Sequence, residues 1–185
     1  MQKNGLKTMA IADVIEPITQ KLVIEPLTQA AFAEFGDVIE TENRDYFMIN
    51  NGSTRRYHKL AKATIDNGSD VIMSIFEAEP LFYPLTITML ERHPKGSQAF
   101  IPLFKHQYLV VVAPKDNEPN PAKIRAFIAS GDQGVNYHQG VWHHPVLVLK
   151  SKDKFLVVDR SGESSNCDEH FFEKVVLALD LTTFV

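Results

Sequence analysis

The sequence predicts an all-β domain, a barrel or sandwich with one or two short helices. Eight short runs rich in aliphatic and β-branched residues follow one another between residues 71 and 181. Turn-forming residues such as Asn67-Gly68 and Ser161-Gly162 separate them, and little helical patterning lies between. This spacing favours a barrel or sandwich over strand–helix–strand units. The expected strands are Val71–Phe76, Leu85–Leu90, Ala99–Phe104, Tyr108–Ala113, Ile124–Ala129, Val146–Leu149, Phe155–Val158 and Val175–Leu181.

Helix signals occur at two places in the chain. Thr28 can cap a helix that Gly36 ends. Leu27 and Phe32 stand at the positions of a hydrophobic staple around that cap. A second short turn is expected where Pro121 takes the first helical position. The rest of the chain is expected to form strands and turns.

The length of 185 residues fits one domain with a sizeable core. The segment 14–20 is nearly repeated at 23–29, and the second copy leads into the expected domain. Two copies are too few for a solenoid. We therefore expect residues 1–20 to be a loosely held N-terminal extension and residues 21–185 to form a single domain.

Composition and charge limit the classes of partner. Hydrophobic residues make up 44% and charged residues 23%, which is ordinary for a soluble globular protein. The net charge of −4 argues against nucleic acid, because phosphate binding needs a positive field. No apolar run approaches the ~20 residues of a membrane helix, and the first residues lack a signal-peptide core. We therefore expect neither nucleic acid nor a membrane as the main partner.

Cysteine usage points to a reducing compartment. Cys167 is the only cysteine, so no intramolecular disulfide can form, and we expect a cytoplasmic protein. The acidic residues around Cys167 would raise the pKa of its thiol rather than lower it. We interpret this cysteine as structural.

The first cluster of chemically capable residues spans residues 90–102. If residues 90–93 end a strand, Glu91 and His93 point to one face and Arg92 to the other, because side chains alternate along a strand. The chain then turns at residues 94–96, and Gln98 would start the partner strand. Glu91, His93 and Gln98 are therefore expected to converge inside the barrel.

The second cluster spans residues 134–145. It contains three histidines, a tyrosine and the only tryptophan of the chain. His144 follows His143 directly, so it should face the opposite way and serve packing or an outer hydrogen bond. Trp142 is interpreted as a packing residue. Of His143, His144 and Trp142, His143 is the candidate site residue.

Both clusters resemble the two motifs of the cupin barrel. Glu91-Arg92-His93 stands where the H-x-H of the first motif would be, Gln98 stands near its glutamate position, and Gly140-Val141-Trp142-His143 reproduces the G-x2-H of the second. The resemblance implies a double-stranded β-helix barrel with Glu91, His93, Gln98 and His143 as metal ligands. Glu91 and Gln98 are substitutions, and a neutral amide is a weaker ligand than a carboxylate. A metal-bound site and a metal-free site both stay open.

Longer strings of the sequence resemble one family within the cupins. LERHPKGSQAFIPL, YLVVVAP, QGVNYHQGVWHHP, FLVVDR and NCDE, in this order, are similar to the ureidoglycolate lyase family over about residues 22–180. The resemblance implies a homodimer that acts in allantoin breakdown and splits ureidoglycolate into glyoxylate and urea. A divalent metal, often given as nickel, is associated with this family.

Such a cleavage needs a base for the hydroxyl proton and an acid for the departing nitrogen. Imidazoles suit both tasks, because their ordinary pKa of about 6.5 lies near cytosolic pH. We expect His93 and His143, with or without a metal between them, to polarise or deprotonate the hydroxyl. Tyr137 or His138 would serve the leaving nitrogen.

The substrate carboxylate needs a cation or other donors. A guanidinium binds a carboxylate through two parallel hydrogen bonds. Since strand alternation should direct Arg92 outward, Arg160 and Arg56 are the candidates, with Gln98 as a further substrate-binding residue.

Two other functions remain compatible with the sequence. One is another metal-dependent cupin enzyme, a dioxygenase or an isomerase, for which a fuller set of histidine and carboxylate ligands would be expected. The other is a non-enzymatic cupin that binds a small acid.

Overall fold

The computed structural model describes residues 18–173 and 175–184, with side chains for residues 21–173 and 177–182. Most of the expected N-terminal extension, residues 1–17, lies outside the described residues. The first strand begins at Ile18, inside the expected extension.

The described chain is built almost entirely of strands, and the all-β prediction is confirmed. Its helices are one turn of α-helix and one 3-10 turn. The elements are β1 (Ile18–Pro26), α1 (Gln29–Phe32), β2 (Gly36–Ile39), β3 (Phe47–Ile49), β4 (Thr54–Arg56), β5 (Asp70–Ala78), β6 (Leu85–Ile87), β7 (Met89–Arg92), β8 (Gln98–Pro102), β9 (Tyr108–Ala113), η1 (Pro121–Lys123), β10 (Arg125–Ala129), β11 (Gly134–Tyr137), β12 (Trp142–His143), β13 (Leu147–Val148), β14 (Asp153–Ser161), β15 (Asp168–Phe171) and β16 (Val175–Phe184).

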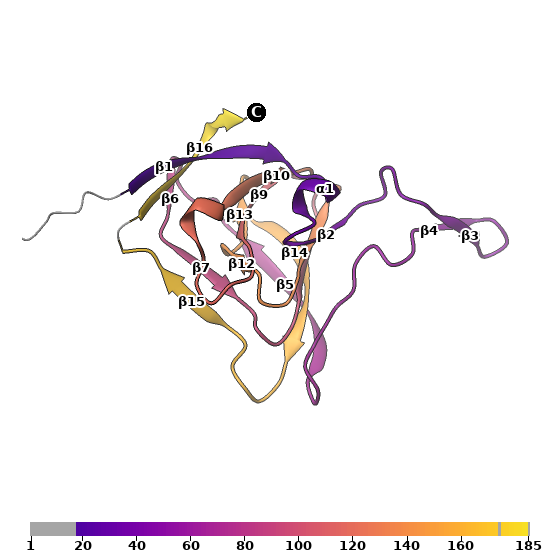
Figure 1. Ribbon diagram of the computed structural model, residues 1–185. Coiled ribbons are helices and arrows are strands. Elements are labelled where there is room, and N and C mark those ends of the chain that lie inside the picture. Colours follow the sequence, from indigo (N-terminus) through magenta and orange to yellow (C-terminus); the bar gives the residue numbers. More distant parts are fainter. Residues whose placement is uncertain (1–17, 174, 185) are drawn as a thin grey trace, which may run out of the picture.

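The strands form two large sheets that curl around a shared interior, as a cupin-like barrel requires (Figure 1). One sheet has the order β15-β7-β12-β9-β10-β1-β16-β6, with β13 also paired to β9. The other has the order β2-β11-β8-β14-β5. The two clusters identified in the sequence lie on strands of both sheets, so the barrel interior is where their side chains can meet.

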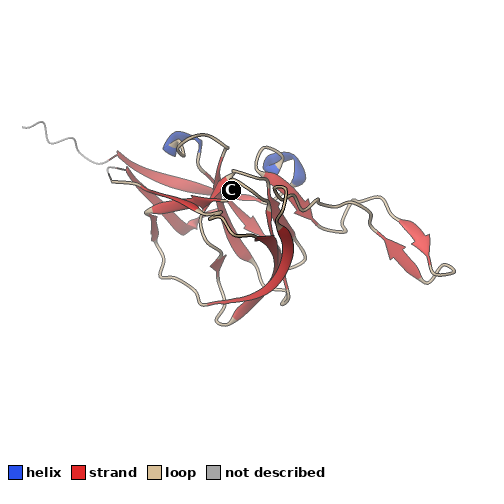
Figure 2. Cartoon of the chain, turned by 90° about the horizontal axis from the view of Figure 1, so that it is seen from below, coloured by secondary structure: helices blue, strands red, loops and turns tan. Residues whose placement is uncertain are grey.

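The hairpin β3–β4 is set apart from these sheets. It forms a separate two-stranded ribbon. Both views of the molecule show it extending away from the barrel (Figures 1 and 2). Tyr46, Phe47 and Met48 leave about half of their surface exposed along it. An isolated two-stranded hairpin is marginally stable in water.

The core follows the alternation of side chains along the strands. In β9, which is buried throughout, Tyr108, Val110 and Val112 belong to one apolar cluster, while the residues between them belong to a second cluster on the other face. Phe127 packs edge-on against Phe32, with ring centroids 5.8 Å apart. These contacts fill most of the barrel with apolar side chains.

The helix signals are correct in position. Thr28 caps α1 by accepting a hydrogen bond from the backbone N–H of Ala31. The helix ends at Phe32, earlier than expected, because Gly36 already belongs to β2. A Cβ at Gly36 would lie 2.1 Å from the carbonyl oxygen of Asn136, so this close strand approach requires glycine. Within the described ranges, no helix is long and apolar enough to cross a bilayer.

Candidate active site

Polar side chains from both sheets meet in one layer of the barrel. In the larger sheet, His143 of β12 lies opposite Glu91 of β7. In the smaller sheet, Tyr137 of β11 lies opposite Gln98 of β8. Directly opposite residues of paired strands share a face. We call Glu91, His93, Gln98, Tyr137, His143 and, as shown below, Asp159 the polar layer.

Gln98 lies in this layer, but its strand is paired differently from the expectation. It was predicted to start the partner strand of the segment 90–93, but β8 pairs with β11 and β14 in the smaller sheet. The contact with the histidines therefore spans the barrel interior. Gln98 Oε1 lies 3.1 Å from His93 Nε2 and 3.2 Å from His143 Nε2.

Backbone carbonyls orient both imidazole rings. His93 Nδ1 lies 2.7 Å from the carbonyl oxygen of Asn166, and His143 Nδ1 lies 3.1 Å from that of Val141. A carbonyl only accepts, so Nδ1 carries the hydrogen in each ring. In the neutral rings, both Nε2 atoms then present lone pairs toward the layer.

The layer has the donor set of a divalent metal site. One ligand atom each from Glu91, His93 and His143 lies within 4.8 Å of the others. With Gln98 Oε1 they form a group of lone-pair atoms that face one another. This is unfavourable unless a cation or a proton donor stands between them. Imidazole and carboxylate ligands fit a transition metal, and the carbonyls that accept from Nδ1 of each histidine would hold the imidazoles in a ligating orientation.

Burial controls the protonation of the layer. His143 is 1% exposed, and burial, followed by the charge of His93, lowers its pKa to about 3. Burial also raises the pKa of Glu91, against the opposing effect of His93. Tyr137 stacks on His143 with ring centroids 4.2 Å apart. Burial, and then Glu91, raise the pKa of Tyr137 far above 10, so its hydroxyl keeps the proton.

A cavity of about 210 Å³ adjoins the layer. At about 30 Å³ per water, it has room for a small polar molecule. Its lining residues are His93, Gln98, Asp159, Arg160, Asn166 and Cys167.

Cys167 contributes no reactive thiolate to this cavity. Its sulfur lies 3.8 Å from Glu91 Oε2. Burial, and then the charge of Glu91, raise the pKa of the thiol to about 11. The thiol therefore stays protonated at neutral pH and is a poor nucleophile.

Arg160 lines the cavity, but its guanidinium is largely engaged. Its Nε and Nη2 donate to the carboxylate of Asp66 at 2.7 and 3.2 Å. Nη1 and Nη2 also donate to the backbone oxygen and hydroxyl of Ser164 at 2.8 and 3.1 Å. Of the five N–H donors of a guanidinium, one Nη1–H has no such partner among the described residues.

Other predicted residues lie away from the layer. His138 Nε2 lies 3.2 Å from Asp37, and both line a different cavity, next to Lys62. Arg56 lies on the exposed hairpin, above the ring of Phe47.

Arg92 points out of the barrel, as strand alternation indicates. Its guanidinium lies over the ring of Trp142 at 4.6 Å and pairs with Asp168 at 2.9 Å. It therefore belongs to packing between strands at the outer surface rather than to the layer.

The sequence reasoning missed Asp159. In β14 the inward positions Phe155 and Val157 are fully buried. Asp159 continues the same period of two and lines the cavity. Alternation along the FLVVDR string was the signal that could have identified it, because it directs Asp159 inward.

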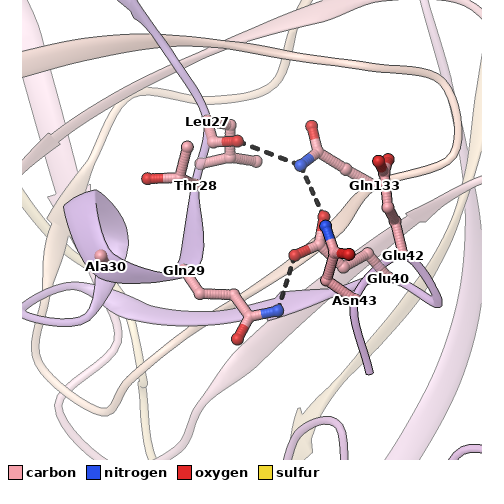
Figure 3. A pocket seen from close by; sticks show the side chains of 8 residues that line it. All are labelled: Leu27, Thr28, Gln29, Ala30, Glu40, Glu42, Asn43 and Gln133. Atoms are coloured by element: carbon pink, nitrogen blue, oxygen red, sulfur yellow. Dashed lines mark hydrogen bonds between the residues drawn. The ribbon is translucent and has the colours of Figure 1, made fainter. Parts of the chain in front are cut away.

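A separate cavity lies beside α1 and is lined by carboxylates and amides (Figure 3). Glu40 accepts hydrogen bonds from Gln29 and Gln133, each at 2.7 Å, and Gln133 also donates to the carbonyl of Leu27 (Figure 3). These groups satisfy one another, and the negative charge of Glu40 and Glu42 disfavours an anionic ligand.

Comparison with known proteins agrees with the geometry. The family model described as ureidoglycolate lyase matches residues 19–178. Proteins named ureidoglycolate lyase from Pseudomonas paraeruginosa PA7 and Stutzerimonas stutzeri A1501 are each 65% identical over 161 residues, which is 86% of this chain and 95% of those proteins. One from Pseudomonas savastanoi pv. phaseolicola is 61% identical over 163 residues, 87% of this chain and 96% of that protein. The chain therefore belongs to the ureidoglycolate lyase family.

Proposed function

We propose that this protein is a ureidoglycolate lyase that splits ureidoglycolate into glyoxylate and urea during allantoin degradation. Membership of the family supports the reaction. The structural observation that carries the proposal is the convergence of His93, His143 and Gln98 in one layer of the barrel, beside a cavity sized for a small acid.

The reaction moves two protons and breaks one bond. The substrate has one carbon that bears a carboxylate, a hydroxyl and a ureido nitrogen. Removal of the hydroxyl proton lets its oxygen form the carbonyl of glyoxylate, while the carbon–nitrogen bond breaks and its electron pair stays on nitrogen. That nitrogen then takes a proton to become urea, and no water is consumed. A site for this reaction needs a base, an acid and a carboxylate partner.

His93 and His143 are the proposed bases. Each has its Nδ1–H held by a carbonyl, so its Nε2 lone pair points into the layer and can accept the hydroxyl proton. Tyr137 is the proposed acid for the leaving nitrogen, because its hydroxyl stays protonated beside His143. His138 suits this role less well, since it lines another cavity.

Gln98 and Arg160 are the proposed partners of the substrate's polar groups. Gln98 has an amide in contact with both imidazoles. The free Nη1–H of Arg160, at the cavity wall, can donate to the substrate carboxylate. Arg56 belongs to β4 of the hairpin that extends away from the barrel (Figure 1), so in this proposal it would act only on a second copy.

A divalent metal, nickel by family resemblance, would be held by Glu91, His93, Gln98 and His143. When bound it would occupy the Nε2 lone pairs of both histidines and, as a Lewis acid, would polarise the substrate hydroxyl in their place, so the two rings act as bases only in the metal-free site. The histidine nitrogens and the glutamate oxygen suit such an ion.

We also propose a cytoplasmic homodimer, as the family resemblance implies. The half-exposed apolar side chains along the hairpin β3–β4, which extends away from the barrel (Figure 2), support a contact with a second copy. The free thiol of Cys167 suits a reducing compartment. The molecular mass in solution, compared between the wild type and a Phe47→Ser variant, tests the contact: the variant should be shifted toward monomer.

The function is tested by incubating the purified protein with ureidoglycolate and measuring urea, glyoxylate and ammonia. Equal release of urea and glyoxylate without ammonia is expected. Ammonia as the first product would instead indicate hydrolysis of the ureido group. A parallel reaction after treatment with a chelator tests the metal: loss of activity that nickel restores is the expected result.

A further inference from the structure

We propose that Asp159 binds the ureido group of the substrate and so sets the orientation in which the substrate enters. This inference rests on the proposed function. It concerns a residue that takes no part in the proton transfers assigned above.

Strand pairing places Asp159 beside the site. In the register of β14 and β8, Val158 lies opposite Ala99. The next step of this antiparallel register brings Asp159 toward Gln98, and opposite residues share a face. Asp159, Gln98 and His93 accordingly line the same cavity.

One oxygen of the Asp159 carboxylate needs a hydrogen-bond donor that the protein does not supply among the described residues. Its Oδ1 is buried, and among the described residues no group donates a hydrogen bond to it. The neighbouring Arg160 pairs with Asp66 instead. A buried acceptor without a donor destabilises the fold, and a donor group of the substrate at this position would complete it.

The missing partner must donate hydrogen bonds. A ureido group presents two N–H bonds on one side, one from the nitrogen attached to carbon and one from the terminal amide. Two parallel N–H donors match the two oxygens of a carboxylate. The substrate carboxylate, by contrast, is repelled by Asp159. The ureido end therefore faces Asp159, and the carboxylate end lies away from Asp159, on the side of the cavity lined by Arg160.

Inhibition by urea and inhibition by glyoxylate each test the binding of one end of the substrate. Urea carries only the ureido donors, whereas glyoxylate carries only the acid end. We expect Asp159→Asn to raise the inhibition constant for urea and the KM for ureidoglycolate by about 10-fold or more, since the new amide N–H opposes a ureido N–H. The inhibition constant for glyoxylate should stay within about threefold, and kcat should change less than KM. The matched control is Asp70→Asn on the neighbouring strand β5, where the side chain is exposed.

Several outcomes overturn the inference. An unchanged inhibition constant for urea would do so, as would a loss of kcat with unchanged KM, which marks a proton-transfer role. The melting temperature of Asp159→Asn should equal or exceed that of the wild type, and a large decrease would indicate a structural carboxylate. If this variant does not fold, Asp159→Ser offers the same comparison. A wild-type enzyme that releases no urea overturns the proposed function itself, whereas normal release with unchanged urea inhibition in the variant overturns only this inference.

Discussion

The polar layer and the apolar clusters lie in the same barrel but differ in how completely their side chains satisfy one another. Around Phe127 the packing is complete: rings of Phe32 and Phe35 contact it at 5.8 and 6.1 Å, and the three side chains are fully buried. In the layer, lone pairs of His93 and His143 face Gln98 Oε1, and Oδ1 of Asp159 has no donor among the described residues. The difference indicates that the clusters supply stability, while the layer is arranged to contact a ligand.

The largest effect is expected in the apolar clusters. Phe127→Ala should lower the free energy of unfolding by about 3–5 kcal/mol, because it removes a buried ring and leaves a cavity. Guanidinium denaturation measures this change. The kcat of the remaining folded enzyme should stay near that of the wild type. A loss below about 1 kcal/mol would mean that these rings are not the main source of stability.

Substitution of a histidine in the polar layer should lower kcat rather than the free energy of unfolding. His143→Ala is expected to lower kcat for urea release by about 100-fold or more, as loss of a general acid or base does. His144→Ala is the control, since this neighbouring ring turns to the carbonyl of Pro145 instead. Near-wild-type turnover in a folded His143→Ala variant would remove this residue from the mechanism.

Two residues compete for the role of acid, and their variants should differ. Tyr137→Phe keeps the ring stacked on His143 but removes the donor, so kcat should fall by about 10-fold to 100-fold. His138→Ala should change kcat by less than about twofold, since His138 lines another cavity. Steady-state kinetics of the two variants decide the assignment, and the opposite ranking would give the role to His138.

The smallest effect concerns the ion pair between Asp66 and Arg160. The hydrogen bond from Arg160, followed by that from Ser69, lowers the pKa of Asp66 from 3.8 to about 2. Because Asp66 ionises more readily in the folded protein, the pair stabilises the fold above about pH 4, and this contribution is lost as the pH falls toward about 2.

Asp66→Asn should therefore show a slightly smaller drop in melting temperature between about pH 5 and about pH 2 than the wild type. Thermal denaturation across this range measures it. A larger drop in the variant would show that the ion pair does not act in this way.

The fold could be predicted because it depends on local patterns. The run Tyr108–Ala113 matches β9 residue for residue, and Thr28 caps α1 as expected. Short strands with polar or mixed composition were missed, including β11 and β12. Their pairing is decided by neighbouring strands rather than by their own sequence, which is why local patterns could not reveal them.

The candidate site could be predicted only in part. Alternation correctly separated Arg92 from Glu91, and motif spacing selected His93 and His143 as candidates. The engagement of Arg160 by Asp66 was not predictable, because the two are far apart in the sequence. Contacts of this kind depend on tertiary structure, which periodicity does not encode.

The most direct test of the account observes the histidine rings while a product binds. With 15N-labelled histidine, addition of glyoxylate to the wild-type protein should shift the ring-nitrogen resonances of His93 and His143. The resonances of His58, His106 and His170 should remain unchanged. Shifts confined to those three histidines, with His93 and His143 unaffected, would contradict the location of the active site in the polar layer.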